Sequence, residues 1–83
     1  VRPQEDPERA LRYVDTVLSI DPESVSDRLF RAVLRYDTGR TTEGLEDVDW
    51  VLDRQPEGVE LARVRQLRDA LEEKRSATRN PRP

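Results

Sequence analysis

Apolar side chains recur at steps of three and four along four segments of the chain, with polar residues between them. This spacing places them on one face of an α-helix. It predicts helices over about residues 7–19, 25–38, 42–54 and from 57 or 58 to 75. No segment alternates with a period of two, so no strand is expected. The short connections favour antiparallel neighbours, and the predicted fold class is all-α with about four helices.

Capping residues and prolines separate these segments. A short side-chain acceptor suits the N-cap, and proline suits the first helical position. The expected N-caps are Asp6 before Pro7, Ser24, and either Thr41 or Thr42. Gly39 is the expected stop of the second helix because it can adopt positive φ, while Pro22 and Pro56 end the first and third helices.

The first and third predicted helices carry closely similar sequences that lie 34 positions apart. The coinciding residues are Leu11 with Leu45, Val14 with Val48, Val17 with Val51, Leu18 with Leu52 and Pro22 with Pro56. A period of this length is typical of helical-hairpin repeats, in which each unit buries one face against its neighbour. Such an array tolerates the lean composition of this chain, with 34% hydrophobic and 40% charged residues.

Composition and charge exclude several functional classes. The chain has neither Cys nor His, which excludes disulfides and thiolate metal sites and removes the commonest general base. Residues 1–58 hold eight Arg and fourteen acidic residues, whereas residues 59–83 hold seven basic and four acidic residues. This acidic body with a basic end argues against a nucleic-acid groove. No apolar run could span a bilayer, and a cytoplasmic location is expected.

The sequence does not contain a set of residues with the types and spacing that catalysis requires. The carboxylates of the third helix lack calcium-loop spacing and read as a solvated face. With three Gly in all, no phosphate-binding loop is present, and no His is available to activate Ser or Thr. We therefore expect no enzyme activity, no cofactor and no metal.

The repeat resembles the tetratricopeptide repeat, a unit of helix A, turn and helix B. With Val25 at the first position, residues 25–58 form one full unit, flanked by half-units. The small and turn positions are then filled by Ala32, Gly39, Gly44 and the terminal Pro56. This arrangement implies a domain over 7–75, between a flexible lead-in at 1–6 and a disordered tail at 76–83. Because the chain begins at Val1, it is expected to be a fragment of a larger protein.

Shorter motifs are similar to those of a narrower group, the C-terminal repeats of bacterial transglutaminase-like proteins of the invasion-regulator type. They are Asp21-Pro22, Arg31-Ala32, Thr38-Gly39-Arg40 and Gly44-Leu45-Glu46-Asp47-Val48. Thr38 and Gly44 depart from the usual residues of that group, and Arg28, Arg31 and Arg35 replace the large apolar residues of a generic helix A. The transglutaminase-like domain itself is not in this chain, so none of its activity transfers.

In the tetratricopeptide family, helix A lines a concave peptide groove. The matching residues here are Ser26, Leu29, Phe30, Val33, Tyr36 and Asp37, joined by Arg63, Leu67 and Ala70 from the last helix. The alternative is that these side chains meet a preceding helix of the intact protein. Lys and Asn, which a clamp for C-terminal carboxylates requires, are lacking on this face.

Three further features carry competing interpretations. Arg31 either pairs with Asp47 in a structural ion pair or lies over the core with its head in water. Trp50 either contacts a partner or packs on the following helix. The stripe of Leu11, Val14 and Leu18 is expected to be half bare, because the first helix lacks its own helix A.

These features favour a non-catalytic module that binds a protein or peptide. One alternative is an accessory repeat domain packed on a transglutaminase-like domain of the same polypeptide. Another is a self-associating module, a homodimer formed through the incomplete first repeat.

Overall fold

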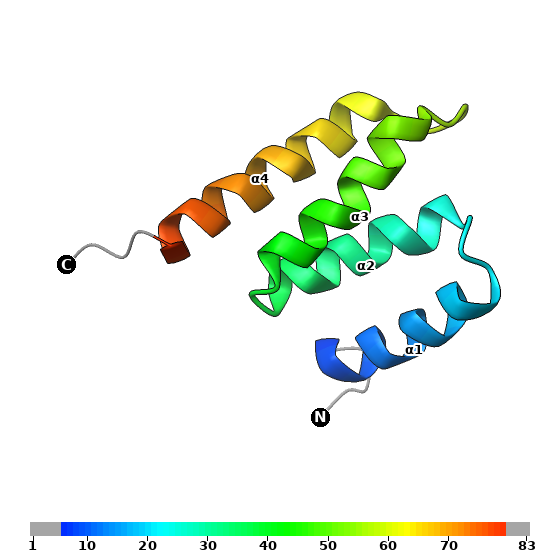
Figure 1. Cartoon of the computed structure of the whole chain (residues 1–83), viewed down its shortest axis with the longest axis horizontal. Helices are drawn as coiled ribbons and strands as arrows, with labels where there is room; N and C mark the ends of the chain where they lie inside the picture. Colours follow the sequence, from blue (N-terminus) through cyan, green and yellow to red (C-terminus); the bar gives the residue numbers. More distant parts are fainter. Residues whose placement is uncertain (1–5, 80–83) are drawn as a thin grey trace.

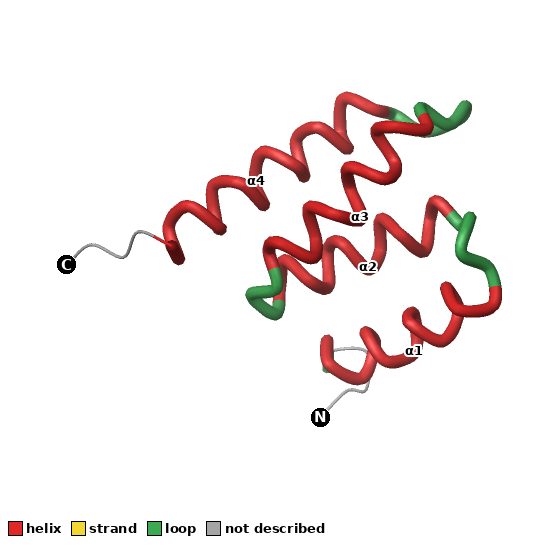
Figure 2. The backbone as a smooth tube through the Cα atoms, viewed as in Figure 1, coloured by secondary structure: helices red, strands yellow, loops and turns green. Residues whose placement is uncertain are grey.

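The computed structural model describes residues 6–79, and within this range it contains four helices and no strand. They are α1 (Pro7–Ile20), α2 (Val25–Asp37), α3 (Thr41–Arg54) and α4 (Leu61–Arg79). Successive helices run antiparallel through short turns (Figures 1 and 2). The all-α prediction is confirmed. Residues 76–79 belong to α4, so the expected disorder is wrong there, while 1–5 and 80–83 lie outside the described residues.

The helix starts follow the predicted capping chemistry at two of three sites. An Asp6 carboxylate oxygen accepts hydrogen bonds from the backbone N–H groups of Glu8 and Arg9, at 3.1 and 3.3 Å. The Ser24 hydroxyl oxygen accepts one from the N–H of Asp27. The prediction for α3 is wrong, because its N-cap is Arg40, which makes no side-chain cap bond. Thr41 is instead the first helical residue, and it is buried.

Two apolar clusters hold the helices together. The smaller joins α1 to α2 through Leu11, Val14, Leu18 and Leu34. The larger joins α2, α3 and α4 through Ala32, Leu45, Val48, Val51, Val64 and Leu71. Because α2 covers the α1 stripe, the expectation that this stripe is half bare is wrong.

The repeat period of 34 residues relates α1 to α3, whereas α2 and α4 are related by 37 residues. Asp15 accepts a hydrogen bond from Arg31, and Asp49, which lies 34 positions after Asp15, accepts one from Arg68, which lies 37 after Arg31. The packing agrees, because Ala10 lies in the cluster of Leu34, whereas its counterpart Gly44 lies against Leu71. The turn before α4 is therefore longer, and α4 begins at Leu61 rather than 57 or 58.

The longer turn begins with a residue in a costly backbone conformation. Gln55, the C-cap of α3, has φ 46° and ψ 57°, in the left-handed region. A side chain there is disfavoured by about 1–2 kcal/mol, whereas glycine adopts this region readily. Gln55→Gly is therefore expected to raise the unfolding free energy by roughly 0.5–1 kcal/mol, measured by urea denaturation.

The matched control for this prediction is Gln66→Gly, at an exposed position inside α4. The same substitution should there lower the unfolding free energy by about 1 kcal/mol, because glycine disfavours helix interiors. Equal effects of the two substitutions would show that the left-handed geometry of Gln55 is not the cause.

Candidate functional site

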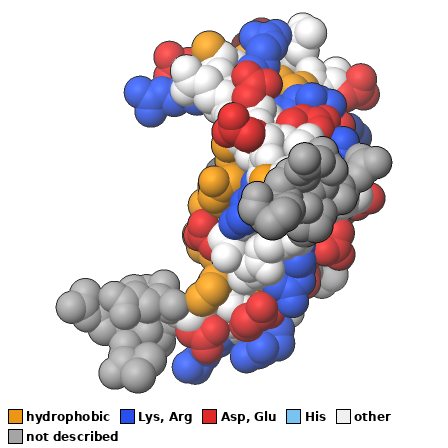
Figure 3. Space-filling model, turned by 90° about the vertical axis from the view of Figure 1, so that its left-hand side faces the viewer, with side chains coloured by type: hydrophobic (Ala, Val, Ile, Leu, Met, Phe, Trp, Pro, Cys, Tyr) orange, Lys and Arg blue, Asp and Glu red, His pale blue; other side chains and the backbone are white. Residues whose placement is uncertain are grey.

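The candidate groove begins with two exposed apolar side chains on α2. Phe30 and Val33 are 47% and 43% exposed, although large apolar side chains are usually buried. They lie three residues apart and so share one face of the helix. Figure 3 shows a crescent whose hollowed side carries hydrophobic side chains along its inner wall.

The other predicted groove residues divide into two groups. Ser26, Asp37 and Arg63 are exposed. Leu29, Tyr36 and Leu67 are half-buried and pack against the larger apolar cluster. They therefore support the surface rather than form most of it. Ala70, on the same face of α4 as Leu67, is also half-buried.

Lys74 joins α4 to α2 at one end of this surface, a contact that the sequence did not predict. Its ammonium nitrogen lies 4.1 Å from the centre of the Tyr36 ring and donates a hydrogen bond to the Tyr36 carbonyl oxygen. An ammonium over an aromatic face is attracted by the negative face of the ring. The offset of 37 residues that aligns Arg68 with Arg31 aligns Lys74 with Asp37, so the repeat pattern alone gives no signal for the contact with Tyr36.

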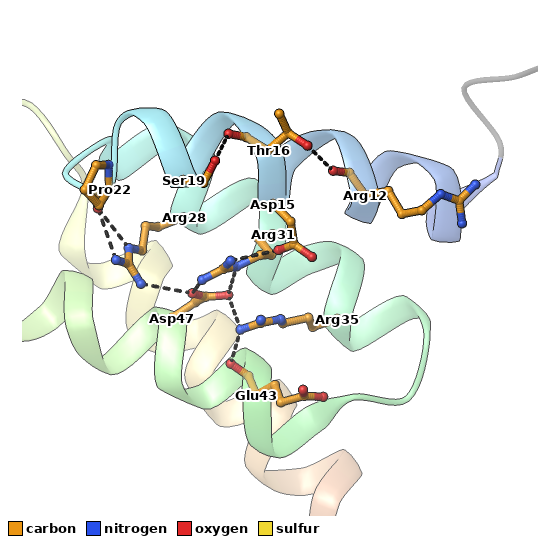
Figure 4. Close-up of polar contacts among 10 residues, drawn as sticks. All are labelled: Arg12, Asp15, Thr16, Ser19, Pro22, Arg28, Arg31, Arg35, Glu43 and Asp47. Atoms are coloured by element: carbon orange, nitrogen blue, oxygen red, sulfur yellow. Dashed lines mark hydrogen bonds and ion pairs between the residues drawn. The ribbon is translucent and has the colours of Figure 1, made fainter.

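A buried carboxylate forms the centre of a separate polar site. Asp47 of α3 is only 1% exposed, and three arginines of α2 surround it (Figure 4). Arg31 donates two parallel hydrogen bonds to its oxygens, at 3.0 and 2.8 Å. Arg35 donates one of 2.8 Å, and an Arg28 nitrogen lies 3.6 Å away. These contacts compensate the charge of a carboxylate that is withdrawn from water.

The arginines connect this centre to its surroundings. Arg31 also donates to Asp15 of α1 at 2.8 Å, so a single guanidinium bridges α1 and α3. Arg35 donates to the Glu43 carbonyl oxygen, and Arg28 to the Pro22 carbonyl oxygen (Figure 4). The hydrogen bond to Asp47 raises the pKa of Arg31, and burial opposes this effect only in part. The guanidinium therefore stays charged in the folded protein.

The sequence offered the pair of Arg31 and Asp47 as one of two interpretations, and it did not indicate the cluster. The signal was available, because Arg28, Arg31 and Arg35 recur at steps of three and four and so share one helix face. These three arginines occupy positions where a generic tetratricopeptide helix A has large apolar residues. Their chemistry in the structure is the charge compensation of one carboxylate.

Trp50 lies within this arrangement rather than on a free surface. Its ring is half-buried and packs against the larger apolar cluster. The guanidinium carbons of Arg28 and Arg54 lie 4.3 and 3.8 Å from the ring centre. Each such contact contributes about 0.5–1 kcal/mol at an exposed site and more where it is desolvated. Trp50 therefore packs against the apolar cluster and two arginines of the described fold.

Neither a metal-ligand cluster nor a membrane-spanning helix occurs within residues 6–79. No group of three or more acidic side chains in this range is placed to hold a metal ion. None of the four described helices combines the length and the apolar character that crossing a membrane requires.

The stacked antiparallel hairpins define the chain as a helical-repeat protein. The sequence model of the tetratricopeptide repeat matches residues 2–69, and the chain belongs to that family. Comparisons with curated proteins and with solved structures gave no match. The resemblance to repeats of transglutaminase-like proteins gains no support from these comparisons and stays a prediction.

Proposed function

We propose that this chain is a non-catalytic module that binds a protein segment along the face formed by α2 and α4. The observation that carries the proposal is the exposure of Phe30 and Val33 on a helix whose other large apolar side chains are covered. Apolar surface that remains in water favours association. Tetratricopeptide proteins are typically protein-binding, and helical repeats present concave surfaces for this purpose.

The geometry supports a short and partly apolar ligand. Leu67 and Ala70 of α4 are half-buried, and α2 and α4 contact each other directly. The contact between Lys74 and Tyr36 bounds one end. Near the start of α4, Arg63 forms an exposed ion pair with Glu60 at 2.9 Å, and its charge is accessible to a ligand from solvent. A segment with apolar side chains and an acidic residue fits these features.

The test is selection of peptides from a displayed random library on the intact chain, followed by affinity measurements in solution. Phe30→Lys is expected to weaken the selected peptides at least about tenfold, because aromatic anchors dominate such interfaces. Tyr13→Lys, which alters an equally apolar exposed residue on α1, should leave the affinity unchanged. Peptides that bind Phe30→Lys as tightly as the original chain would contradict the proposal.

Self-association is a second candidate, favoured by exposed apolar residues on α1. The alternative of a repeat domain packed on a transglutaminase-like domain depends on the short sequence motifs alone.

A further inference from the structure

Helix α1 carries a second apolar stripe besides the one that α2 covers. It consists of Ala10, Tyr13, Val17 and Ile20, at steps of three, four and three, which place them on one helix face. Tyr13 is 70% exposed and Ile20 80% exposed, the two highest values among the large apolar residues of the described chain. Among the described helices, only α2 packs on α1, and it does so mainly through the other stripe, with the half-buried Ala10 at the border between the two.

The internal repeat indicates that this face of α1 is suited to packing against another helix. Its counterparts in α3, 34 positions later, are Gly44, Asp47, Val51 and Arg54. Helix α2 packs on that face, since Arg35 and the Ala32 carbonyl lie close to Gly44 and three arginines reach Asp47. The equivalent surface of α1 therefore has the position of a helix-packing surface, and no helix within residues 6–79 covers it.

Tyr13 stands where α3 has the buried carboxylate of Asp47, and this difference determines what can pack on the α1 face. A helix like α2 would bring its arginines onto an apolar surface that offers no carboxylate, which is unfavourable. The occupant must instead present apolar side chains. The stripe of α1 meets this requirement itself.

We propose that two copies of this chain pair through α1 in an antiparallel, two-fold symmetric contact. With the axis near Asp15, Ala10 of each copy lies opposite Ile20 of the other, and Tyr13 lies opposite Val17. A small residue thus faces a large one in every layer. A parallel pair would set Tyr13 against Tyr13 and Ala10 against Ala10, which packs less well.

The charges favour the same direction. Arg9 and Arg12 make no ion pair within residues 6–79, and they lie in the first half of α1. Asp21 and Glu23 lie in the turn at its other end. An antiparallel pair brings the arginines of one copy beside the acidic turn of the other, whereas a parallel pair brings arginines together. The contact leaves α2 and α4 accessible, so it is independent of the proposed groove.

The contact involves one helix of 14 residues from each copy. It is therefore smaller than the standard interface of about 800 Å² per partner, and the dimer should be weak and concentration-dependent. Sedimentation equilibrium over a range up to millimolar protein is expected to show reversible dimerisation. Ile20→Lys should abolish it without changing helix content, because the side chain is exposed, and Phe30→Lys should not affect it.

The chain has no cysteine, so cross-linking can test the direction of the pair. Oxidation of the double variant Ala10→Cys with Ile20→Cys is expected to give a covalent dimer, while Ile20→Cys alone should remain uncross-linked. A strict monomer at millimolar concentration, or equal dimerisation of Ile20→Lys, would overturn the proposal. Efficient cross-linking of Ile20→Cys alone would overturn the antiparallel arrangement.

Discussion

Asp47→Ala is expected to lower the unfolding free energy by about 3–5 kcal/mol, because it leaves three part-buried arginines without the carboxylate that they share. Arg31 and Arg35 hydrogen-bond to Asp47 directly, and neither can release its charge. A domain of this size has roughly 4–12 kcal/mol in total. The loss is therefore a large fraction of the total stability, and the urea midpoint should fall accordingly. Urea denaturation followed by circular dichroism and Trp50 fluorescence measures the effect.

A matched control lies two residues along the same helix. Asp49 also accepts a hydrogen bond from an arginine, Arg68, at 2.7 Å, but it does so at the surface. Because exposed ion pairs contribute only about 0–1 kcal/mol, Asp49→Ala should leave the stability nearly unchanged. The difference between the two variants isolates burial, since the substitution and the helix are the same.

Replacing one of the arginines should lower the unfolding free energy less than replacing Asp47. Arg31→Met removes two hydrogen bonds to Asp47, but Arg35 and Arg28 still contact the carboxylate. Its effect on the unfolding free energy should therefore be smaller than that of Asp47→Ala, although clearly measurable. Unchanged stability in Arg31→Met would mean that the pair is not structural. An Asp47→Ala variant within about 1 kcal/mol of the original chain would refute the account of the whole cluster.

The helices were predictable because their signals are local. Apolar spacing, Asp6 and Ser24 as caps, and the glycine after α2 act within one or two turns of the chain, so they can be recognised without knowledge of the tertiary fold. The start of α4 was missed for the opposite reason. Extending the period of 34 assumes equal turns, and only the contacts of Arg68 and Leu71 show that this turn is longer.

The polar cluster was predictable only as a pair. The pair of Arg31 and Asp47 was one of two interpretations of the sequence, but the burial of the carboxylate and the approach of Arg28 and Arg35 depend on how closely α2 and α3 pack. The distance between α2 and α3 depends in turn on Gly44 of α3. The same limit applies to α1, where the exposed stripe is not the one with the most leucines, because α2 covers that one.

The glycine at this crossing supports the second large prediction. A Cβ atom at Gly44 would lie 2.8 Å from Leu71 Cδ2 and 3.4 Å from the Ala32 carbonyl oxygen, so α2, α3 and α4 meet here without spare volume. Leu71 is fully buried. Leu71→Ala is expected to lower the unfolding free energy by about 2–5 kcal/mol, through lost apolar transfer and the cavity that remains.

Two opposing effects should nearly cancel in Gly44→Ala alone. Alanine favours a helix interior by about 1 kcal/mol relative to glycine. The added methyl group must displace Leu71, and overpacking of this kind typically costs about 1–3 kcal/mol. The single variant is therefore expected to be neutral or mildly destabilised in urea denaturation.

The combination with Leu71→Ala separates these two effects. Once the leucine is truncated, the methyl group at position 44 occupies part of the cavity, and the helix preference acts without opposition. Gly44→Ala should then stabilise the chain, giving a favourable coupling energy of about 1–2 kcal/mol in a double-mutant cycle. The same cycle with Leu34→Ala should be additive, because Leu34 lies in the smaller cluster. Additivity in both cycles would show that contact with Leu71 is not what requires glycine at this crossing.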